Sequence, residues 1–444
     1  MVNLNFICNW LVAGNDAPEY RQTMAMLEMH LGNVNLLKNQ DVWSKTIRES
    51  VLVSTYPLAM WLTSAWWRLN WEPLPAHRVG PPVDWRMAHE MGAANHGFVW
   101  PQIIFASDHE VMQVWAVPLN VNENQSVRYL NGLEIPASIS LTDFQTGVEN
   151  FITAVLDRLA ALGCKNTELL NLWQLVQEER SDQESAKYRR LEAEMGFDPD
   201  ECPEELMKKA LVLDKKMGTA ALSELAPVYG KSATQTPLVT IEEIADSPGL
   251  VGVLRAPRPA GSIVFPGAPW QRAVAAAGAL RQELGNRHDL LDNAKLCELL
   301  GLSVSEVEHW SPAKRNAAIA VPESENHYKF IPRKKHPIAK RFELARFLGD
   351  YLLTEQPGQW LASTDLSTSR QKYQRAFAAE FLCPIATLRE FLQEDYSETA
   401  IEDAAEYFQV SSTTVESMLV NNGLLSSPLP VDYTESRLPY RLGI

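Results

Sequence analysis

The chain has 444 residues, of which 46% are hydrophobic and 21% are charged, and this composition is typical of packed globular domains. It excludes a fibrous or wholly disordered chain, and the length predicts two or three domains of about 150 residues each. With 55 acidic and 40 basic residues, the net charge of −15 opposes broad binding to nucleic acid or anionic lipid.

The five cysteines are widely spaced and form no C-x-x-C pair. This pattern fits neither a disulfide framework nor a structural zinc site, so we expect reduced cysteines. The first basic residue is Arg21, which does not favour a secretory leader. The most membrane-like segment, 51–67, carries no charge, but it contains Pro57 and is short for a membrane span. We therefore expect a cytoplasmic protein without a membrane segment.

Residues 1–140 are expected to form a tryptophan-rich α+β domain of no recognised family. Nine of the thirteen tryptophans lie in its first 120 residues, which indicates a large aromatic core. The segments 114–121 and 127–141 have the composition of strands with turns between them. The segments 24–31 and 51–67 are predicted to be helical.

Helical periodicity dominates residues 141–230, and this section carries a long charged stretch on what we expect to be a solvated face. Residues 231–261 are rich in glycine and proline and predict a linker or a crossing of irregular strands, with a domain boundary near Ala260. Mainly helical segments fill 262–427, interrupted by a loop that ends at Pro337. A loosely packed tail is expected after them, at residues 428–444. The chain as a whole is predicted to be a multi-domain α+β protein.

In the first domain, His89 and Glu90 begin a pattern similar to H-E-x-x-H. Ala93 stands where the second histidine is required, and His96 follows His89 by seven residues. On one helix this spacing covers about 10 Å, too far for both histidines to hold one zinc ion. We expect no metal here and regard His89, Glu90 and His96 as structural or partner-contacting candidates.

Two later segments carry the strongest signal. Residues 341–353 read R-F-E-L-A-R-F-L-G-D-Y-L-L and have apolar residues at helical spacing, and residues 377–384 read F-A-A-E-F-L-C-P. They resemble the two signatures of the ImmA/IrrE family of zinc metallopeptidases, approximately R-F-T-L-A-H-E-L-G-H-x-L-L and A-N-x-F-A-A-E-L-L-M-P, in the same order. The resemblance covers roughly residues 260–425. It implies a mainly helical, zincin-like peptidase domain over 262–427.

The departures from this family fall on its catalytic positions. In an H-E-x-x-H helix, two histidines bind zinc and the glutamate acts as general base. Those positions hold Arg346, Phe347 and Asp350 here, and the family's third ligand, a glutamate, aligns with Gln371. Arginine stays protonated, phenylalanine takes no proton, and one aspartate cannot hold the metal alone. We therefore expect no zinc or other cofactor, and an Arg346–Asp350 ion pair in its place.

A cluster of basic residues precedes this helix: Arg333, Lys334, Lys335, His336, Lys340 and Arg341. A short cationic run beside a helix start is usually a solvated face. It could also meet nucleic acid or an acidic partner, because net charge is screened beyond a Debye length of about 8 Å. Only Tyr328 and Phe330 add aromatic rings nearby, so the case for nucleic acid is weak.

The resemblance implies a bacterial-type protein that retains a peptidase scaffold without its zinc chemistry. Members of the ImmA/IrrE family commonly act on helix-turn-helix repressors in stress, mobile-element or phage-response circuits. We therefore expect a catalytically degenerate pseudo-peptidase with a regulatory or protein-interaction role. Its expected partner is a helix-turn-helix regulator or a co-encoded effector, with recognition or assembly supplied by the tryptophan-rich domain.

Three alternatives stay open. The chain could be an active zinc metallopeptidase with displaced ligands, namely Asp350 with His336 or Glu380, or an enzyme that uses the segment 89–96. It could carry a remodelled catalytic centre made of Arg346, Asp350, Glu343 and Gln371. It could also be a nucleic-acid-associated effector that uses the basic cluster, whose affinity would fall steeply with salt.

Overall fold

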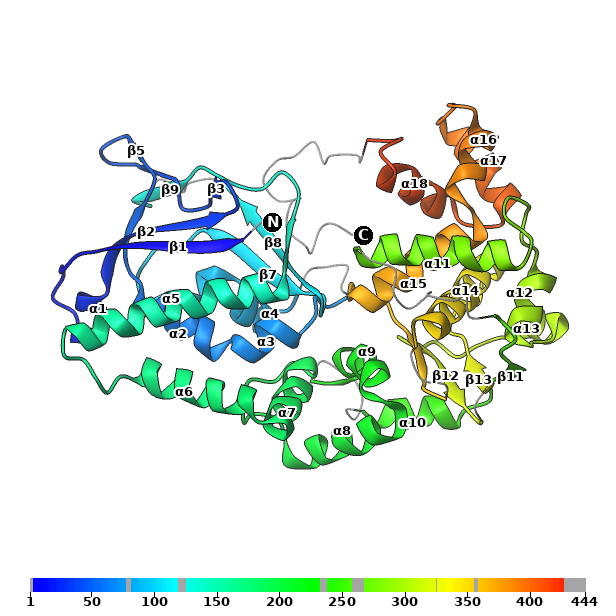
Figure 1. The fold of residues 1–444 in the computed structure, drawn as a ribbon, viewed down its shortest axis with the longest axis horizontal. Helices are drawn as coiled ribbons and strands as arrows, with labels where there is room; N and C mark the ends of the chain where they lie inside the picture. The colour runs from blue at the N-terminus through cyan, green and yellow to red at the C-terminus, as the bar shows by residue number, and fades with distance from the viewer. Residues whose placement is uncertain are drawn as a thin grey trace. The chain divides into compact units, whose positions relative to one another are not determined.

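The computed structural model describes residues 3–76, 81–118, 125–231, 238–257, 267–324, 326–354 and 358–426. The α+β class is confirmed, because strands concentrate in the N-terminal part and helices dominate the later part (Figure 1). The chain forms two compact units, one up to Met207 and one over Lys208–Leu429. We call them the N-terminal unit and the C-terminal unit.

Three antiparallel sheets lie in the described part of the N-terminal unit. In the first, β2 (Met24–Leu31) pairs with β1 (Leu4–Trp10), β3 (Val34–Asn35) and β6 (Val51–Ser54). The second has the order β10 (Ala137–Ser140), β8 (Val111–Val117), β7 (Gln102–Ser107). The third has the order β5 (Thr46–Arg48), β4 (Asn39–Asp41), β9 (Val127–Tyr129). Strands β8, β9 and β10 confirm part of the two predicted strand segments, of which residues 119–121 lie outside the described residues.

The helix predicted over 24–31 is wrong, because this segment is strand β2. Its side chains alternate in burial, with Ala25, Leu27, Met29 and Leu31 in the core. Methionine, leucine, alanine and glutamate favour helices when a segment is considered alone. Pairing with β1 and β6 satisfies the backbone of β2 and buries one of its faces. This tertiary context outweighs the local preference.

The helix predicted over 51–67 is correct only after its first residues, which form β6. Helix α2 (Tyr56–Ser64) has Pro57 in its first turn, where the missing N–H leaves no hydrogen bond unmade. Helix α3 (Trp66–Trp71) follows. Among the helices that the structure describes, none combines the length and hydropathy that crossing a bilayer requires.

The described part of the N-terminal unit has six further helices before the border: α1 (Pro18–Gln22), α4 (Val83–His89), the 3-10 helix η1 (Met91–Ala94), α5 (Leu141–Ala161), α6 (Glu168–Ser181) and α7 (Gln183–Glu194). Helix α5 lies along β1 (Figure 1). Gly147 permits this approach, because a Cβ there would lie 2.5 Å from the carbonyl oxygen of Leu4. The predicted burial of the tryptophans is confirmed for Trp61, Trp66, Trp67, Trp85, Trp100 and Trp115. Trp10 and Trp71 are partly buried, and Trp43 is 79% exposed.

The border between the units falls inside α8 (Glu204–Met217), and the segments that follow belong to the C-terminal unit. Its antiparallel sheet has the order β11 (Leu250–Val253), β13 (His327–Ile331), β12 (Ala318–Pro322), β14 (Leu361–Ser363). The loop predicted up to Pro337 therefore contains two strands, β12 and β13, and that prediction is wrong. Strand β11 lies before the boundary expected near Ala260 but supplies the edge of this sheet, so the compact unit begins earlier. The tail at 428–444 lies outside the described residues.

The described part of the C-terminal unit also has ten helices: α9 (Thr219–Tyr229), α10 (Val239–Asp246), α11 (Pro269–Glu283), α12 (Asn293–Leu300), α13 (Val304–His309), α14 (Pro337–Leu353), α15 (Ser369–Leu382), α16 (Ile385–Leu392), α17 (Glu398–Phe408) and α18 (Ser412–Asn421). Helix α15 packs between α11 and α14, and α14 also contacts β14 (Figure 1). Gly349 lets α14 approach α15, because a Cβ there would lie 2.7 Å from the ring of Phe377. This packing sets the positions of the residues aligned with the peptidase site.

Candidate functional site

Helix α14 carries three of the four residues aligned with the peptidase site. It begins after His336 with Pro337 in its first turn, a position that suits the fixed φ of proline. Arg346 and Asp350 lie one turn apart in its middle, and both are buried. The fourth residue, Gln371, is buried in the first turn of α15. Thr368 caps that helix by accepting a hydrogen bond from the Gln371 backbone N–H at 3.2 Å.

The structure brings Arg346 and Gln371 together. Arg346 Nη2 donates to Gln371 Oε1 and to the carbonyl oxygen of Thr364, the latter at 2.7 Å. Gln371 Oε1 also accepts from the Thr364 backbone N–H at 2.9 Å, and Gln371 Nε2 donates to the Ala362 carbonyl oxygen at 3.0 Å. The side chains at the aligned first and third ligand positions are therefore hydrogen-bonded to each other.

Asp350 forms an ion pair with Arg370 rather than with Arg346, so the predicted Arg346–Asp350 pair is wrong. Arg370 Nε lies 2.7 Å from Asp350 Oδ1, and its Nη2 lies 3.0 Å from Oδ2. The Ala362 backbone N–H donates to Oδ2 as well, at 3.0 Å. Burial acts to lower the pKa of Arg370, but the charge and hydrogen bonds of Asp350 outweigh it and raise that pKa. This bidentate geometry gives Asp350 a better partner than its neighbour on α14.

Phe347, at the general-base position, does not join this polar network. It is fully buried in the core of the C-terminal unit, and its ring meets that of Phe330 on β13 edge-on, with 5.7 Å between the centroids. The position that would carry a proton in the family therefore stabilises the contact between helix and sheet.

These residues do not fit the zinc ion that the resemblance implies. Both oxygens of Asp350 and the side-chain oxygen of Gln371 already accept hydrogen bonds, and Arg346 offers only donors. In the part of the chain that the structure describes, no three His, Cys, Asp or Glu side chains gather closely enough to hold a metal ion. Glu380, a displaced-ligand candidate, accepts a hydrogen bond from the Ile385 backbone N–H at 3.2 Å instead.

A pocket of about 310 Å³ opens beside Arg346. It lies between α14 and the N-terminus of α18, next to the segment that leads into α14. Its lining consists of Lys334, His336, Ile338, Ala339, Phe342, Glu343, Arg346, Ser411 and Thr414. The region around the two signature segments thus combines a closed polar network with an adjacent open pocket, and Arg346 belongs to both.

The basic cluster is not one exposed surface, which corrects its interpretation as a solvated or nucleic-acid-binding face. Three of its members are buried: Arg333, Lys340 and Arg341. Arg333 is paired with Glu343 and Asp365, each at 2.9 Å. Lys340 Nζ donates to carbonyl oxygens at the end of α13, and Arg341 donates to Asn293. Only Lys334, Lys335 and His336 keep solvent-accessible side chains.

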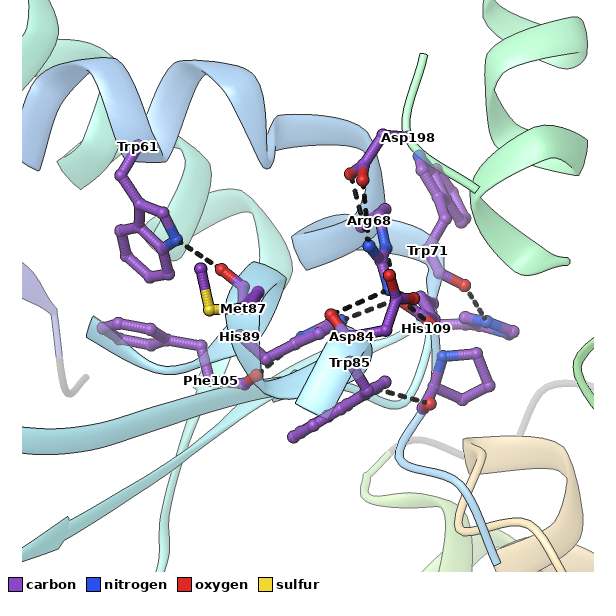
Figure 2. A network of polar contacts seen from close by, with 12 residues as sticks. Trp61, Arg68, Trp71, Asp84, Trp85, Met87, His89, Phe105, His109 and Asp198 are labelled. Carbon is purple, nitrogen blue, oxygen red and sulfur yellow. Dashed lines mark hydrogen bonds and ion pairs between the residues drawn. The ribbon is translucent and has the colours of Figure 1, made fainter. Parts of the chain in front are cut away.

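His89 belongs to a second buried network, in the N-terminal unit (Figure 2). Its Nδ1 lies 2.9 Å from the Phe105 carbonyl oxygen and its Nε2 lies 3.1 Å from Glu72 Oε2. Glu72 also accepts from Arg68 Nε at 2.7 Å, so it is ionised. A carbonyl and a carboxylate are both acceptors, so each ring nitrogen of His89 faces an acceptor oxygen.

Arg68 stands at the centre of this network, and Figure 2 shows carboxylates around its guanidinium group. Its Nη2 donates to Asp84 at 3.0 Å and its Nη1 to Asp198 at 3.2 Å, in addition to the Glu72 contact. Burial acts to lower the pKa of Arg68, but these three carboxylates outweigh it and raise that pKa.

The other two candidates of this segment lie apart from the network. Glu90 forms an ion pair with Arg86, and His96 stacks on Tyr20 with 4.0 Å between ring centroids. The structure therefore does not bring His89, Glu90 and His96 together as one site.

Sequence reasoning missed Arg370 and Arg68, the partners that complete the two networks. Arg370 directly precedes Gln371, and its place in the first turn of a helix is unfavourable for a cation unless a carboxylate lies nearby. A cation at this position therefore indicates a carboxylate partner, and the sequence offered this signal for Arg370. The sequence signal for Arg68 was weaker: it is the only charged residue in the aromatic segment from Val51 to Trp71.

Comparison with known proteins yields no match to a family model, a curated protein or a solved structure. The function must therefore be argued from the signatures and the geometry described above.

Proposed function

We propose that the C-terminal unit is a non-catalytic, peptidase-like module that binds a protein or peptide partner. The resemblance to the ImmA/IrrE family suggests a regulatory role, with a helix-turn-helix regulator or a co-encoded effector as the partner. The five free cysteines of the chain support a cytoplasmic location.

The observation that carries this proposal is the hydrogen-bonded contact between Arg346 and Gln371. These two residues come from different helices and are 25 positions apart, yet they meet as the first and third ligands of a metal site would. Asp350, at the second ligand position, is joined to the same region by the backbone of Ala362. The aligned positions thus converge, while their side chains supply donors and closed ion pairs in place of metal ligands.

The alternatives have less support. A displaced-ligand peptidase would need a cluster of ligands, and none forms among the described residues. A nucleic-acid effector would need the basic cluster at the surface, but half of its members are buried. A binding role requires neither a cluster of metal ligands nor an exposed basic cluster, because a fold can keep a binding cleft after losing its catalytic residues.

The proposal is tested by rebuilding the metal site. We expect the full-length variant Arg346→His/Asp350→His/Gln371→Glu to bind about one zinc ion per chain, measured by elemental analysis after dialysis. The wild type should bind none. Arg346→His/Asp350→His, which lacks the third ligand, is the matched control and should hold zinc more weakly. Circular dichroism would verify that each variant is folded.

Two results would overturn the proposal. About one zinc ion per wild-type chain, lost in Asp350→Ala, would show that the native residues hold a metal. A folded triple variant that fails to bind zinc would show that the three positions do not form a peptidase-like site.

A further inference from the structure

The pocket beside Arg346 has one apolar wall. Ile338, Phe342 and Arg346 are spaced four apart on α14 and therefore lie along one face of the helix. Ala339 adds a second small apolar surface next to them. A volume of about 310 Å³ is at the lower end of the range for small-molecule sites. The pocket suits one apolar group about the size of an amino-acid side chain.

Arg346 gives this pocket a buried positive charge without a carboxylate of its own. The residue is 4% exposed, and among the described residues it donates through Nη2 alone, to two neutral carbonyl-type oxygens. Its Nε is enclosed and makes no hydrogen bond within the described part of the chain. A buried guanidinium normally needs an anion or more acceptors than this.

The carboxylates near Arg346 pair with Arg333 instead. Glu343, which lines the pocket, accepts hydrogen bonds from Arg333 Nε and from the backbone N–H groups of Arg333 and Lys334. Asp365 is also paired with Arg333. Burial, followed by the charges of Arg375 and Arg333, lowers the pKa of Arg346 to about 9 despite Glu343 and Asp365. The guanidinium is still protonated at neutral pH, and an additional anion would stabilise it.

Other groups around the pocket also favour an anion. Lys334 lines it and forms no ion pair within the described residues, and His336 lies beside Lys334. Across the pocket stands the N-terminus of α18, a ten-residue helix capped by Ser411, whose first N–H groups carry partial positive charge. The helix terminus adds to the field of Arg346 and would not by itself define a site.

We propose that this pocket binds a carboxylate joined to an apolar group. The carboxylate would lie against Arg346 and the start of α18, and the apolar group against Ile338 and Phe342. Such a ligand is either a small free carboxylic acid or the C-terminal residue of a peptide. A phosphate fits less well, because most of the lining near Arg346 is hydrocarbon. This inference rests on the proposed binding role of the C-terminal unit and names the chemistry that the unit recognises.

The test is calorimetric titration of the full-length protein with three probes: hexanoate, an acetylated tetrapeptide ending in leucine carboxylate, and the same tetrapeptide with a C-terminal amide. We expect saturable one-site binding of at least one carboxylate and none of the amide. Binding of hexanoate alone would identify a free acid as the source. Binding of the peptide acid would identify a chain terminus. Both results support the proposal.

Variants then assign the site. Arg346→Met should weaken binding at least tenfold, because a desolvated charge-assisted hydrogen bond is lost. Phe342→Trp should weaken carboxylate binding to a similar extent, because the larger ring fills the pocket without changing its charge. This variant tests the proposal if Arg346→Met does not fold. Arg389→Met removes an exposed arginine from α16 and is the matched control, with binding expected to change less than twofold.

The proposal is overturned if the folded wild type binds neither carboxylate at millimolar concentration, or if Arg346→Met or Phe342→Trp binds as the wild type does. Equal affinity for inorganic phosphate would overturn the carboxylate assignment. The zinc measurement on the rebuilt site does not depend on this pocket being occupied. If the wild type bound no carboxylate but the triple variant bound zinc, the carboxylate proposal would be wrong and the proposal of a peptidase-like scaffold would still be supported.

Discussion

Arg68 and Arg346 are both almost fully buried, but their surroundings differ. Each of the three guanidinium nitrogens of Arg68 donates to a carboxylate, from Glu72, Asp84 or Asp198. Arg346 has only neutral acceptors, all on Nη2. The pKa of Arg68 is raised by its neighbours and that of Arg346 is lowered by burial. A buried arginine saturated by carboxylates is part of the framework, whereas one left unsaturated at a pocket retains capacity for a ligand.

The largest effect is expected at Asp350, the carboxylate that pairs with Arg370 between α14 and α15. Asp350→Ala leaves Arg370, whose side chain is only 13% exposed, without its ion-pair partner and the Ala362 N–H without an acceptor. We expect the free energy of unfolding of the C-terminal unit to fall by about 3–5 kcal/mol. Hydrogen exchange of α14 and α15, followed by mass spectrometry in the full chain, would measure this change.

The double variant Asp350→Ala/Arg370→Met is the control for this expectation. It removes both charges, so it should regain part of the lost stability. If the single and double variants were equally unstable, the ion pair would not be the source of the effect, and loss of packing would explain it.

The comparison of the two arginines predicts unequal costs for one substitution. Arg68→Met breaks contacts with three carboxylates and should destabilise the N-terminal unit by about 3 kcal/mol. Arg346→Met removes an unpaired buried charge and leaves Gln371 Oε1 bonded to the Thr364 N–H, so it should cost about 1 kcal/mol or less. Urea-induced unfolding of the two variants, monitored by hydrogen exchange, would compare these costs. Equal costs would contradict the distinction between a framework arginine and a ligand-site arginine.

Glu72 provides a test through pH. Burial acts to raise the pKa of Glu72, but His89 and Arg68 outweigh it and hold this pKa below its usual value. A lowered folded-state pKa stabilises the unit above the unfolded-state pKa of about 4.3, and this contribution is lost as the pH falls through the folded-state value. Glu72→Gln should therefore cost about 2 kcal/mol at pH 7, and progressively less at acidic pH.

Stability of the N-terminal unit between pH 3 and pH 7 would check this difference. Glu134→Gln, at an exposed position, is the matched control and should follow the wild type throughout. A constant difference between Glu72→Gln and the wild type over this range would rule out a contribution from the ionised Glu72 carboxylate.

The sequence allowed the helices of the signature segments to be predicted, because their apolar residues recur at helical spacing. It did not reveal β2, where helix-favouring residues form a strand through pairing with β1 and β6. The reason is physical, because strand pairing depends on distant segments. For the same reason β12 and β13 were missed, because each pairs with strands distant in sequence.

The sequence selected the residues of the candidate site, but it did not predict which of them contact one another. Aligning two signatures identified Arg346, Asp350 and Gln371, and the structure brings Arg346 and Gln371 into contact. A spacing of four residues suggested that Arg346 and Asp350 pair, but Arg370 lies 20 positions away and binds Asp350 with both arms of its guanidinium. The pocket was not predictable, since it needs α18 to lie opposite α14.

The smallest expected effects come from the basic cluster, which the structure divides into two parts. Lys340 Nζ lies 2.6 Å from the Val307 carbonyl oxygen and 2.9 Å from that of Trp310, so it holds the end of α13. Lys340→Met should cost about 1 kcal/mol, because these carbonyls lose a charged donor. Lys335→Met should change stability by less than about 0.5 kcal/mol, because Lys335 is exposed. Thermal unfolding of both variants would compare them, and equal effects would mean that sequence proximity, rather than burial, sets the role of these lysines.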